Sequence, residues 1–436
     1  MMFPLSELLP LIGKSFISII VNPFFWIFIA VVVNLYRKMG VASRYLFETP
    51  GDLIRRVVLL AILSGIGGGF IGSLLLVFVG VSVNELGGLS LFFTALVLML
   101  IQQRFLCFAY AGGVLSVLHL VFGFPQGFSV AQVMALVAVL HLIEALLIYL
   151  TGSIYLFPVY VSNPRGEVVG GFNLQKFWPL PLVVFFAGLY PDPEVLKGLI
   201  DMPDWWPLIK AGFSGVGDGN EVVYSMLAVP AVLGYGDIAT TTTPREKTRR
   251  TAGELAAFSI VLLLLAIAAG HVKVFAYAAA LFGPLGHEAL IHLERRRERG
   301  ERPLYVGVEE GLKLLHVWAG TPLAKAQVRS GDILLAVNGQ AVHHERELRE
   351  ALAAGVKTMR RDGKIVAQHD LLYFAAADSE KRHTTVACRE GEAARACSRT
   401  GMGCEQIFVC GDLAQPLKKV VAEDNQTQKK ITTSTA

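Results

Sequence analysis

Residues 130–150 read VAQVMALVAVLHLIEALLIYL, an apolar run that contains a single carboxylate, Glu144. A helix that crosses a bilayer needs about 20 apolar residues, because the hydrocarbon core is roughly 30 Å thick and each residue rises about 1.5 Å. This run therefore predicts a membrane-spanning helix. Six other apolar stretches, two of them short, predict helices of the same kind: Ile17–Tyr36, Val57–Gly80, Leu89–Gln103, Phe105–Phe124, Leu255–Gly270 and Val272–Leu285.

Two further apolar pieces, Trp178–Tyr190 and Val222–Tyr235, are shorter and contain prolines. Each holds only about 14 residues, too few for a regular crossing. We expect them either to span the membrane as distorted helices or to form a re-entrant pair. Both alternatives add two crossings or none, so the orientation of later segments does not depend on the choice.

The composition agrees with a membrane protein. Hydrophobic residues make up 53% of the 436 positions and charged residues 17%, whereas a soluble domain carries about 25% charged residues. The net charge is only +4, and the basic clusters flank apolar segments, which argues against a nucleic-acid-binding surface. We therefore expect lipid as a partner, with no nucleic acid and no cofactor.

The cysteines predict no metal site. Cys107 lies in an apolar segment, and the other four, Cys388, Cys397, Cys404 and Cys410, lie near the carboxyl end. Structural zinc sites usually contain a close cysteine pair, and this chain has no Cys-x-x-Cys pair. We expect reduced thiols.

Loop charges predict the orientation, because cytoplasmic loops are enriched in lysine and arginine. Basic residues gather before Val57 and before Leu255, and the loops Val81–Gly88 and Pro125–Ser129 contain none. Following the alternation to the end places everything after Leu285 in the cytoplasm. The basic clusters are Arg37, Lys38, Arg44, Arg55 and Arg56, then Arg245, Lys247, Arg249 and Arg250, and finally Arg295, Arg296, Arg297, Arg299 and Arg302.

Glycines crowd one predicted membrane helix, Val57–Gly80. Small residues at helical spacing let neighbouring segments approach closely. We expect packing within the chain, with homodimerisation as the alternative. The glycines are Gly65, Gly67, Gly68, Gly69 and Gly72.

These patterns divide the chain into four parts: a multi-pass membrane domain at 1–286, a basic linker at 287–302, a β-rich domain at 303–374 and a tail at 375–436 that we expect to be largely disordered. Strands are predicted at Leu304–Val308, Leu312–Val317 and Asp332–Val337 from alternating apolar residues. The predicted fold class is a polytopic α-helical membrane domain followed by a small α+β domain.

The most specific stretch of the soluble part reads GTPLAKA at 320–326 and SGDILLAVNG at 330–339. Asn338-Gly339 is a strong hairpin signal, and Gly331 suits a tight turn. A Pro-x-x-x-Ala turn, a Gly-Asp pair that opens a strand and a Val-Asn-Gly turn follow one another in order. Over Tyr305–Leu352 the chain resembles the PDZ family, which implies a compact PDZ-like domain.

The PDZ resemblance implies a peptide-binding groove. Such domains capture an extended peptide by strand addition, with backbone amides holding its carboxylate. The alternative is a groove that is filled by the chain itself and serves as a spacer. By the resemblance, the groove residues are Tyr305, Val306, Gly307, Val308, Leu348 and Leu352.

No catalytic machinery is predicted. His287 and His292 are five residues apart and point about 140° apart on a helix, so they cannot share a zinc ion as site-2 proteases require. His141 and Glu144 lie three apart in a membrane helix, with His119 in the helix before. Ionisable groups in a bilayer are candidates for ion or proton transport, and we favour an interhelical hydrogen-bond set.

The membrane helices, the terminal PDZ-like module and the stretch Asn163–Pro179 together resemble MinJ-type division-site topology determinants of Gram-positive bacteria. The resemblance implies a septal or polar plasma-membrane adaptor that recruits Min and DivIVA-type proteins through its cytoplasmic module, without catalysis. Homo-oligomers are compatible with it. The alternatives are a regulatory subunit of an intramembrane protease or secretion machine, and a transporter-like bundle with a PDZ regulator.

Overall fold

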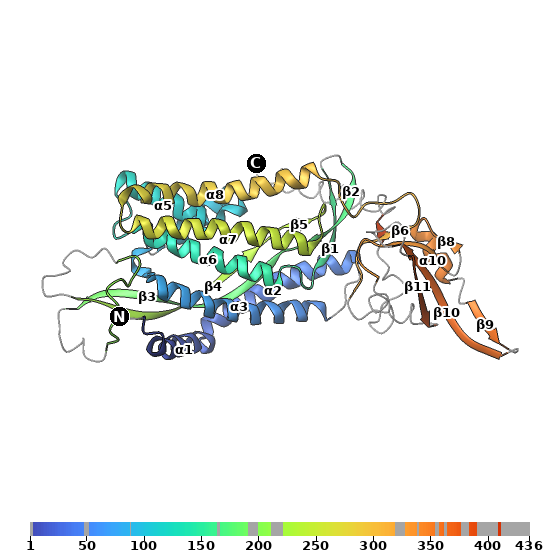
Figure 1. Ribbon diagram of the computed structural model, residues 1–436, viewed down its shortest axis with the longest axis horizontal. Helices are drawn as coiled ribbons and strands as arrows, with labels where there is room; N and C mark the ends of the chain where they lie inside the picture. The colour runs from blue at the N-terminus through green and yellow to red at the C-terminus, as the bar shows by residue number, and fades with distance from the viewer. Residues whose placement is uncertain are drawn as a thin grey trace, which may run out of the picture.

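The computed structural model describes residues 3–47, 52–87, 89–163, 166–190, 199–210, 221–318, 328–337 and 340–353, together with strands at 357–361, 364–375, 383–389 and 409–410. A bundle of long helices makes up most of the molecule, and small sheets lie at one end of it (Figure 1). The chain is thus a helical membrane domain followed by small sheets.

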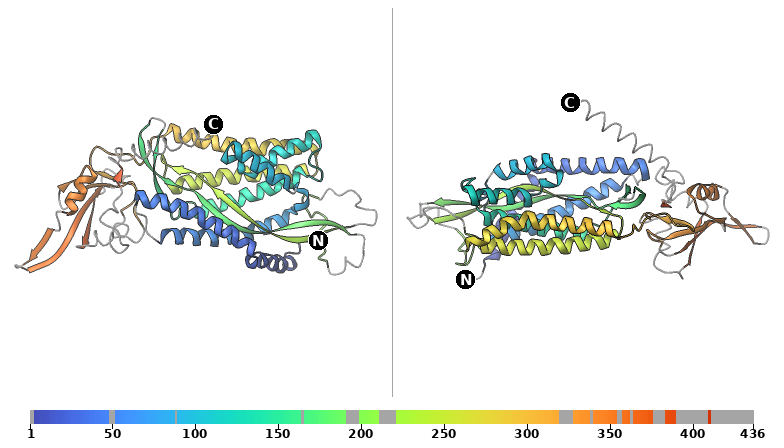
Figure 2. Two further views of the ribbon diagram at one scale, coloured as in Figure 1. Left: turned by 180° about the vertical axis from the view of Figure 1, so that it is seen from behind. Right: turned by 90° about the horizontal axis from the view of Figure 1, so that it is seen from above.

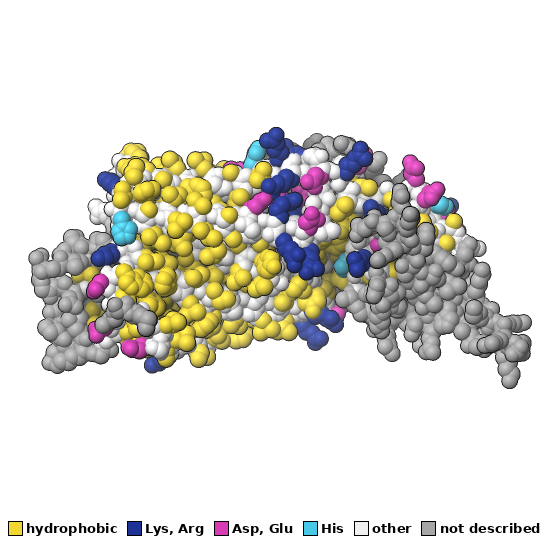
Figure 3. All heavy atoms as spheres, viewed as in Figure 1, with side chains coloured by type: hydrophobic (Ala, Val, Ile, Leu, Met, Phe, Trp, Pro, Cys, Tyr) yellow, Lys and Arg dark blue, Asp and Glu magenta, His cyan; other side chains and the backbone are white. Residues whose placement is uncertain are grey.

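Within the part of the chain that the structure describes, five helices are long and apolar enough to cross a membrane. Their outward side chains are apolar, as shown by Leu59 and Leu264, which are each about three-fifths exposed, and by the hydrophobic belt in Figure 3. Arginine and lysine gather where the belt ends next to the small sheets. The five are α2 (Pro23–Phe47), α3 (Leu53–Val79), α6 (Val130–Thr151), α7 (Pro244–Ala269) and α8 (Lys273–Gly300).

The first predicted helix, Ile17–Tyr36, is wrong in its bounds. The chain forms α1 (Leu5–Val21) and then α2, with Asn22 between them in an extended conformation. The Asn22 side chain accepts a hydrogen bond from the Phe24 amide, and Pro23 begins the new helix. Proline is favoured at the first helical position because its missing N–H would have no partner there.

The two proline-containing pieces are strands, so the alternative of distorted helices was wrong. β3 (Lys176–Tyr190) pairs with β4 (Glu221–Tyr235) along their full length. The hairpin runs along the bundle from the end near the small sheets to the opposite end (Figure 2). The second strand returns to the end of the bundle at which the first begins. The predicted orientation of later segments therefore does not change.

An open sheet edge is costly among apolar groups, because each unpaired N–H loses its hydrogen bond. The edge of β3 that faces away from β4 avoids this cost. The amide of Phe177 donates to the Tyr36 hydroxyl, that of Val183 to Ser73 and that of Phe185 to the Val81 carbonyl. The two remaining edge positions between them are Pro179 and Pro181, which carry no N–H.

The glycines of α3 allow this close approach. A Cβ on Gly65 would lie 2.4 Å from the carbonyl oxygen of Pro179, and one on Gly69 would lie 2.3 Å from that of Pro181. Gly68 faces Ile143 and Leu147 of α6, and Gly72 faces both Leu182 of β3 and Ile143 of α6. The predicted role in packing within the chain is confirmed for these four glycines, whereas a Cβ on Gly67 would meet no atom within 4 Å.

Two shorter helices form a hairpin: α4 (Leu89–Ile101) and α5 (Phe108–Phe122), joined by the 3-10 turn η2 (Gln103–Leu106). At its tip, Arg104 forms an ion pair with Glu288, near the middle of α8. The tip therefore lies halfway along the bundle, and α4 and α5 are not two complete crossings as predicted.

The small sheets lie beyond the end of the helices. One has the order β1-β2-β5, with β1 (Phe157–Ser162), β2 (Val168–Asn173) and β5 (Ile238–Ala239). The other has the order β11-β10-β7-β6-β12, with β8 on β7 and β9 on β10. Its strands are β6 (Leu312–Leu314), β7 (Ile333–Val337), β8 (Gln340–Ala341), β9 (Lys357–Arg361), β10 (Lys364–Ala375), β11 (His383–Arg389) and β12 (Val409–Cys410), accompanied by helix α10 (Glu345–Ala353).

The strand predictions for the module are mixed. β6 and β7 lie within two of the predicted stretches, and β7 and β8 pair on either side of Asn338-Gly339, which itself lies outside the described residues. The predicted strand Leu304–Val308 is wrong, since only Tyr305 forms an isolated bridge there. β11 and β12 lie in the stretch expected to be a disordered tail, and the rest of that stretch, like the predicted turn at 320–326, is outside the described residues.

Candidate functional site

The module is joined to the membrane domain by backbone hydrogen bonds. The amide of Gly170 in β2 donates to the Tyr305 carbonyl at 2.8 Å, and the amide of Leu304 donates to the Thr240 carbonyl, also at 2.8 Å. A Cβ on Gly170 would lie 2.7 Å from the Leu315 side chain. The glycine therefore lets the chain at Tyr305 lie directly on β2.

Aromatic rings fill the same interface. Phe172 of β2 packs edge-on against Tyr305 and His316, with ring centroids 5.2 and 5.3 Å apart. His316 in turn packs against Trp318 at 4.4 Å. Phe172 and Tyr305 are buried, so the module is docked through an apolar contact and is not merely tethered.

A buried ion cluster lies beneath this interface. The Lys247 side chain at the start of α7 has no exposed surface, and its ammonium lies 2.6 Å from Glu298 and 3.0 Å from Asp237. It also donates to the Ile238 carbonyl in β5. One cation thus connects α7, α8 and the sheet on which the module docks.

The predicted groove residues differ in their burial. Tyr305 is buried against β2, whereas Gly307 is exposed and Val306 and Val308 are partly exposed. Leu348 of α10 is buried, and the side chain of Leu352 lies outside the described residues. The outer edge of β6, the strand that follows Gly307, pairs with β12 from the chain's own carboxyl-terminal part.

The intramembrane polar residues do not form the predicted set. His119 contacts the Pro125 carbonyl in the loop that follows its own helix, and no contact joins it to His141 or Glu144 among the described residues. His141 instead lies next to Cys107 and His287. Sequence reasoning missed this grouping, because its members come from three separate segments and His287 was weighed only together with His292.

Comparison with known proteins supports one resemblance. The chain is 25% identical over 364 residues to the cell division topological determinant MinJ of Bacillus subtilis (strain 168), covering 79% of this chain and 85% of that protein. The predicted MinJ-type resemblance is confirmed. No family model and no solved structure matches the chain.

The docking interface contains a titratable group, His316. Burial lowers the pKa of His316 to about 4, so the folded interface holds a neutral imidazole. The pKa of an unfolded histidine is about 6.5. Between these values the unfolded state binds more protons, so stability falls as the pH drops from about 6.5 to about 4, by up to about 3 kcal/mol.

Acidification should therefore loosen this interface. Hydrogen exchange of the whole chain at pH 7 and pH 5, corrected for intrinsic rates, should show a lower free energy of opening for residues 304–318 at pH 5. His316→Phe should flatten the dependence, because a phenyl ring packs against Phe172 without titrating. His343→Gln, which changes an exposed histidine, should retain it. An unchanged dependence in His316→Phe would assign it to another group.

Proposed function

We propose that this protein is a membrane-anchored adaptor of cell division that recruits partner proteins through its carboxyl-terminal module. The observation that supports this proposal is the similarity to MinJ, which extends over most of both chains. The described residues support it as well, because a small β-rich module lies directly at the basic end of an apolar bundle. In this proposal the protein acts by binding, without catalysis.

The same basic end supports a cytoplasmic module. Cytoplasmic segments are enriched in lysine and arginine, and both α7 and α8 carry such residues at the end next to the module, including Arg250 and Arg297. In this orientation the helices hold the module at the inner membrane surface. Confinement raises the effective concentration for a membrane-associated partner, so a weak contact suffices.

We propose strand addition as the binding mode of the PDZ-like module. An extended peptide of the partner would pair with β6 in place of β12, which contributes only Val409 and Cys410 to the pairing. The exposed Gly307 lies shortly before β6, where the PDZ resemblance expects the backbone to hold a terminal carboxylate. Docking of Tyr305 on β2 would hold this loop in a constant orientation toward the membrane.

A fluorescent fusion in dividing rod-shaped cells tests the proposal. The full chain should concentrate at septa and poles, in the company of Min and DivIVA-type proteins. A variant that ends after Glu301 should remain in the membrane and lose recruitment of those partners. A uniform membrane signal from the full chain would contradict the division role and favour the protease-partner or transporter readings.

Gly307→Glu should abolish partner recruitment while membrane insertion is retained, because a carboxylate side chain would obstruct and repel the terminal carboxylate of the peptide. Gly307 is exposed, so the substitution should leave the amount of folded protein unchanged. Glu309→Gln, an exposed change two residues away, is the matched control. Recruitment at the wild-type level in Gly307→Glu would show that this loop does not hold the partner.

A further inference from the structure

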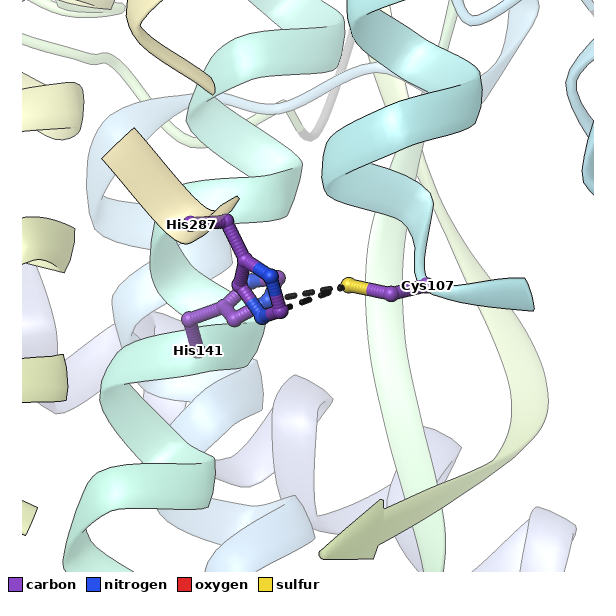
Figure 4. A group of neighbouring side chains, drawn as sticks. All are labelled: Cys107, His141 and His287. Carbon is purple, nitrogen blue, oxygen red and sulfur yellow. Dashed lines mark hydrogen bonds between the residues drawn. The ribbon is translucent and has the colours of Figure 1, made fainter. Parts of the chain in front are cut away.

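Three side chains with metal-ligating atoms converge halfway along the helical bundle. Cys107 precedes α5 at the tip of the short hairpin, His141 lies in the middle of α6 and His287 in the middle of α8. The two imidazole rings and the thiol point toward one another (Figure 4). Their ligand atoms all lie within 4.8 Å of each other.

Hydrogen bonds fix the orientation of both rings. His141 Nδ1 lies 2.7 Å from the Val137 carbonyl and therefore donates its proton there. His287 Nδ1 lies 3.3 Å from the Tyr110 hydroxyl, which itself donates to Glu288 at 2.6 Å. Each Nδ1 thus carries a proton, and each Nε2 presents a lone pair toward Cys107. Outer-shell bonds of this kind orient the histidine ligands of metal sites.

Without a metal, the cluster has two Nε2 acceptors but only one thiol proton to donate to them. Sγ of Cys107 lies 3.2 Å from Nε2 of His141 and 3.9 Å from Nε2 of His287. A thiol has a single proton, so it can satisfy only one of the two lone pairs at a time. A cation at the centre would satisfy both lone pairs and the sulfur together.

The spacing suits a tetrahedral ion. With Zn–S near 2.3 Å and Zn–N near 2.1 Å, a tetrahedral angle separates the sulfur and nitrogen ligands by about 3.6 Å. The two observed Sγ–Nε2 distances lie on either side of this value. Thiolate and imidazole ligands together favour zinc over magnesium or calcium, which prefer oxygen.

We propose that Cys107, His141 and His287 bind one Zn²⁺ ion inside the membrane domain. The Cys107 thiol loses its proton on binding, and that proton is released to solvent. Three protein ligands leave a fourth position for water. Because the ligands come from three segments, the ion fastens the tip of the α4–α5 hairpin to α6 and α8. This proposal does not depend on the proposed division function.

Cobalt substitution tests the site directly. The full chain, with Cys388, Cys397, Cys404 and Cys410 changed to serine so that the tail cannot bind metal, is purified in detergent, stripped with a chelator and titrated with Co²⁺. We expect one Co²⁺ per chain, with thiolate-to-cobalt charge-transfer absorption and the visible bands of tetrahedral Co²⁺. Zn²⁺ should displace the cobalt and remove both signals.

Matched variants assign the ligands. Cys107→Ser should abolish the charge-transfer band, and His141→Gln or His287→Gln should weaken Co²⁺ binding by at least about tenfold, as losses at metal sites do. His292→Gln is the control, since it lies on the same helix as His287 but outside the cluster. A titration with no charge-transfer band, or a band that survives in Cys107→Ser, would overturn the proposal.

A thiol-protection assay needs no variant at the site. In the tail-serine protein, Cys107 is the sole cysteine. Zn²⁺ should slow its alkylation by a maleimide at least tenfold, and a chelator should restore the rate. Equal rates with and without Zn²⁺ would contradict coordination by the sulfur, even if a histidine variant fails to fold.

Discussion

Lys247→Met is expected to destabilise the end of the membrane domain next to the module by about 3 to 5 kcal/mol, the cost of leaving buried charges without their partner. The Lys247 side chain is fully buried and lies within 3.4 Å of Asp237, Glu294 and Glu298. Methionine has a similar length but no charge. It would leave Asp237 and Glu298 without the ammonium, while Arg250 and Arg297 continue to contact Glu294.

Thermal unfolding in detergent, monitored by size-exclusion chromatography, measures this loss of stability. We expect a clear fall in the midpoint for Lys247→Met and partial recovery in the double variant Lys247→Met with Glu298→Gln, which removes one of the unpaired charges. Arg346→Met is the control, because its ion pair with Glu350 is exposed to solvent and exposed pairs contribute little. A midpoint for Lys247→Met equal to that of the control would contradict the role of the cluster.

Gly69→Val is expected to destabilise the membrane domain by about 3 kcal/mol, the upper end for forcing extra atoms into a packed interior. The obstacle is backbone: the first added carbon would lie 2.3 Å from the Pro181 carbonyl oxygen. Since a backbone cannot rotate away as a side chain does, α3 and β3 must separate. Their separation would also break the bond from the Val183 amide to Ser73.

Gly67→Val provides the matched control, since it introduces the same side chain two residues earlier in the same helix. A Cβ on Gly67 meets no atom within 4 Å, so we expect little change in stability. The hydrogen-exchange rates of the Val183 and Phe185 amides should rise in Gly69→Val and stay at the wild-type level in Gly67→Val. Equal behaviour of the two variants would show that α3 and β3 are not in close contact.

The sequence pattern was sufficient to predict a helix or a strand wherever one local property, such as apolar length or alternation, decided the structure. Runs of about 20 apolar residues have few alternatives to a membrane helix. α3 and α6 lie close to their predicted bounds, and α7 ends as predicted but begins earlier, at Pro244. The alternating apolar residues of β7 likewise predicted a strand. Glycine spacing in α3 indicated close packing, although it could not name the partner.

The sequence did not reveal the β3–β4 hairpin, because a strand among membrane helices is stable only if its edge is satisfied by other segments. Tyr36 and Ser73, which supply two of those hydrogen bonds, lie more than 100 residues before β3. Pro179 and Pro181 carried a signal, since two prolines two residues apart remove donors from one edge of a strand. Length and hydropathy alone left a distorted helix and a re-entrant pair as the alternatives.

By itself, the sequence determined that this is a membrane protein with a small β-containing module at its basic end, because apolar length and charge are local properties. Only the tertiary structure decided which polar groups meet. Cys107, His141 and His287 lie on separate segments, and Lys247 meets its carboxylates across α7, α8 and a loop. Such contacts depend on how the segments pack, since partners distant in the chain satisfy one another's buried charges and hydrogen bonds.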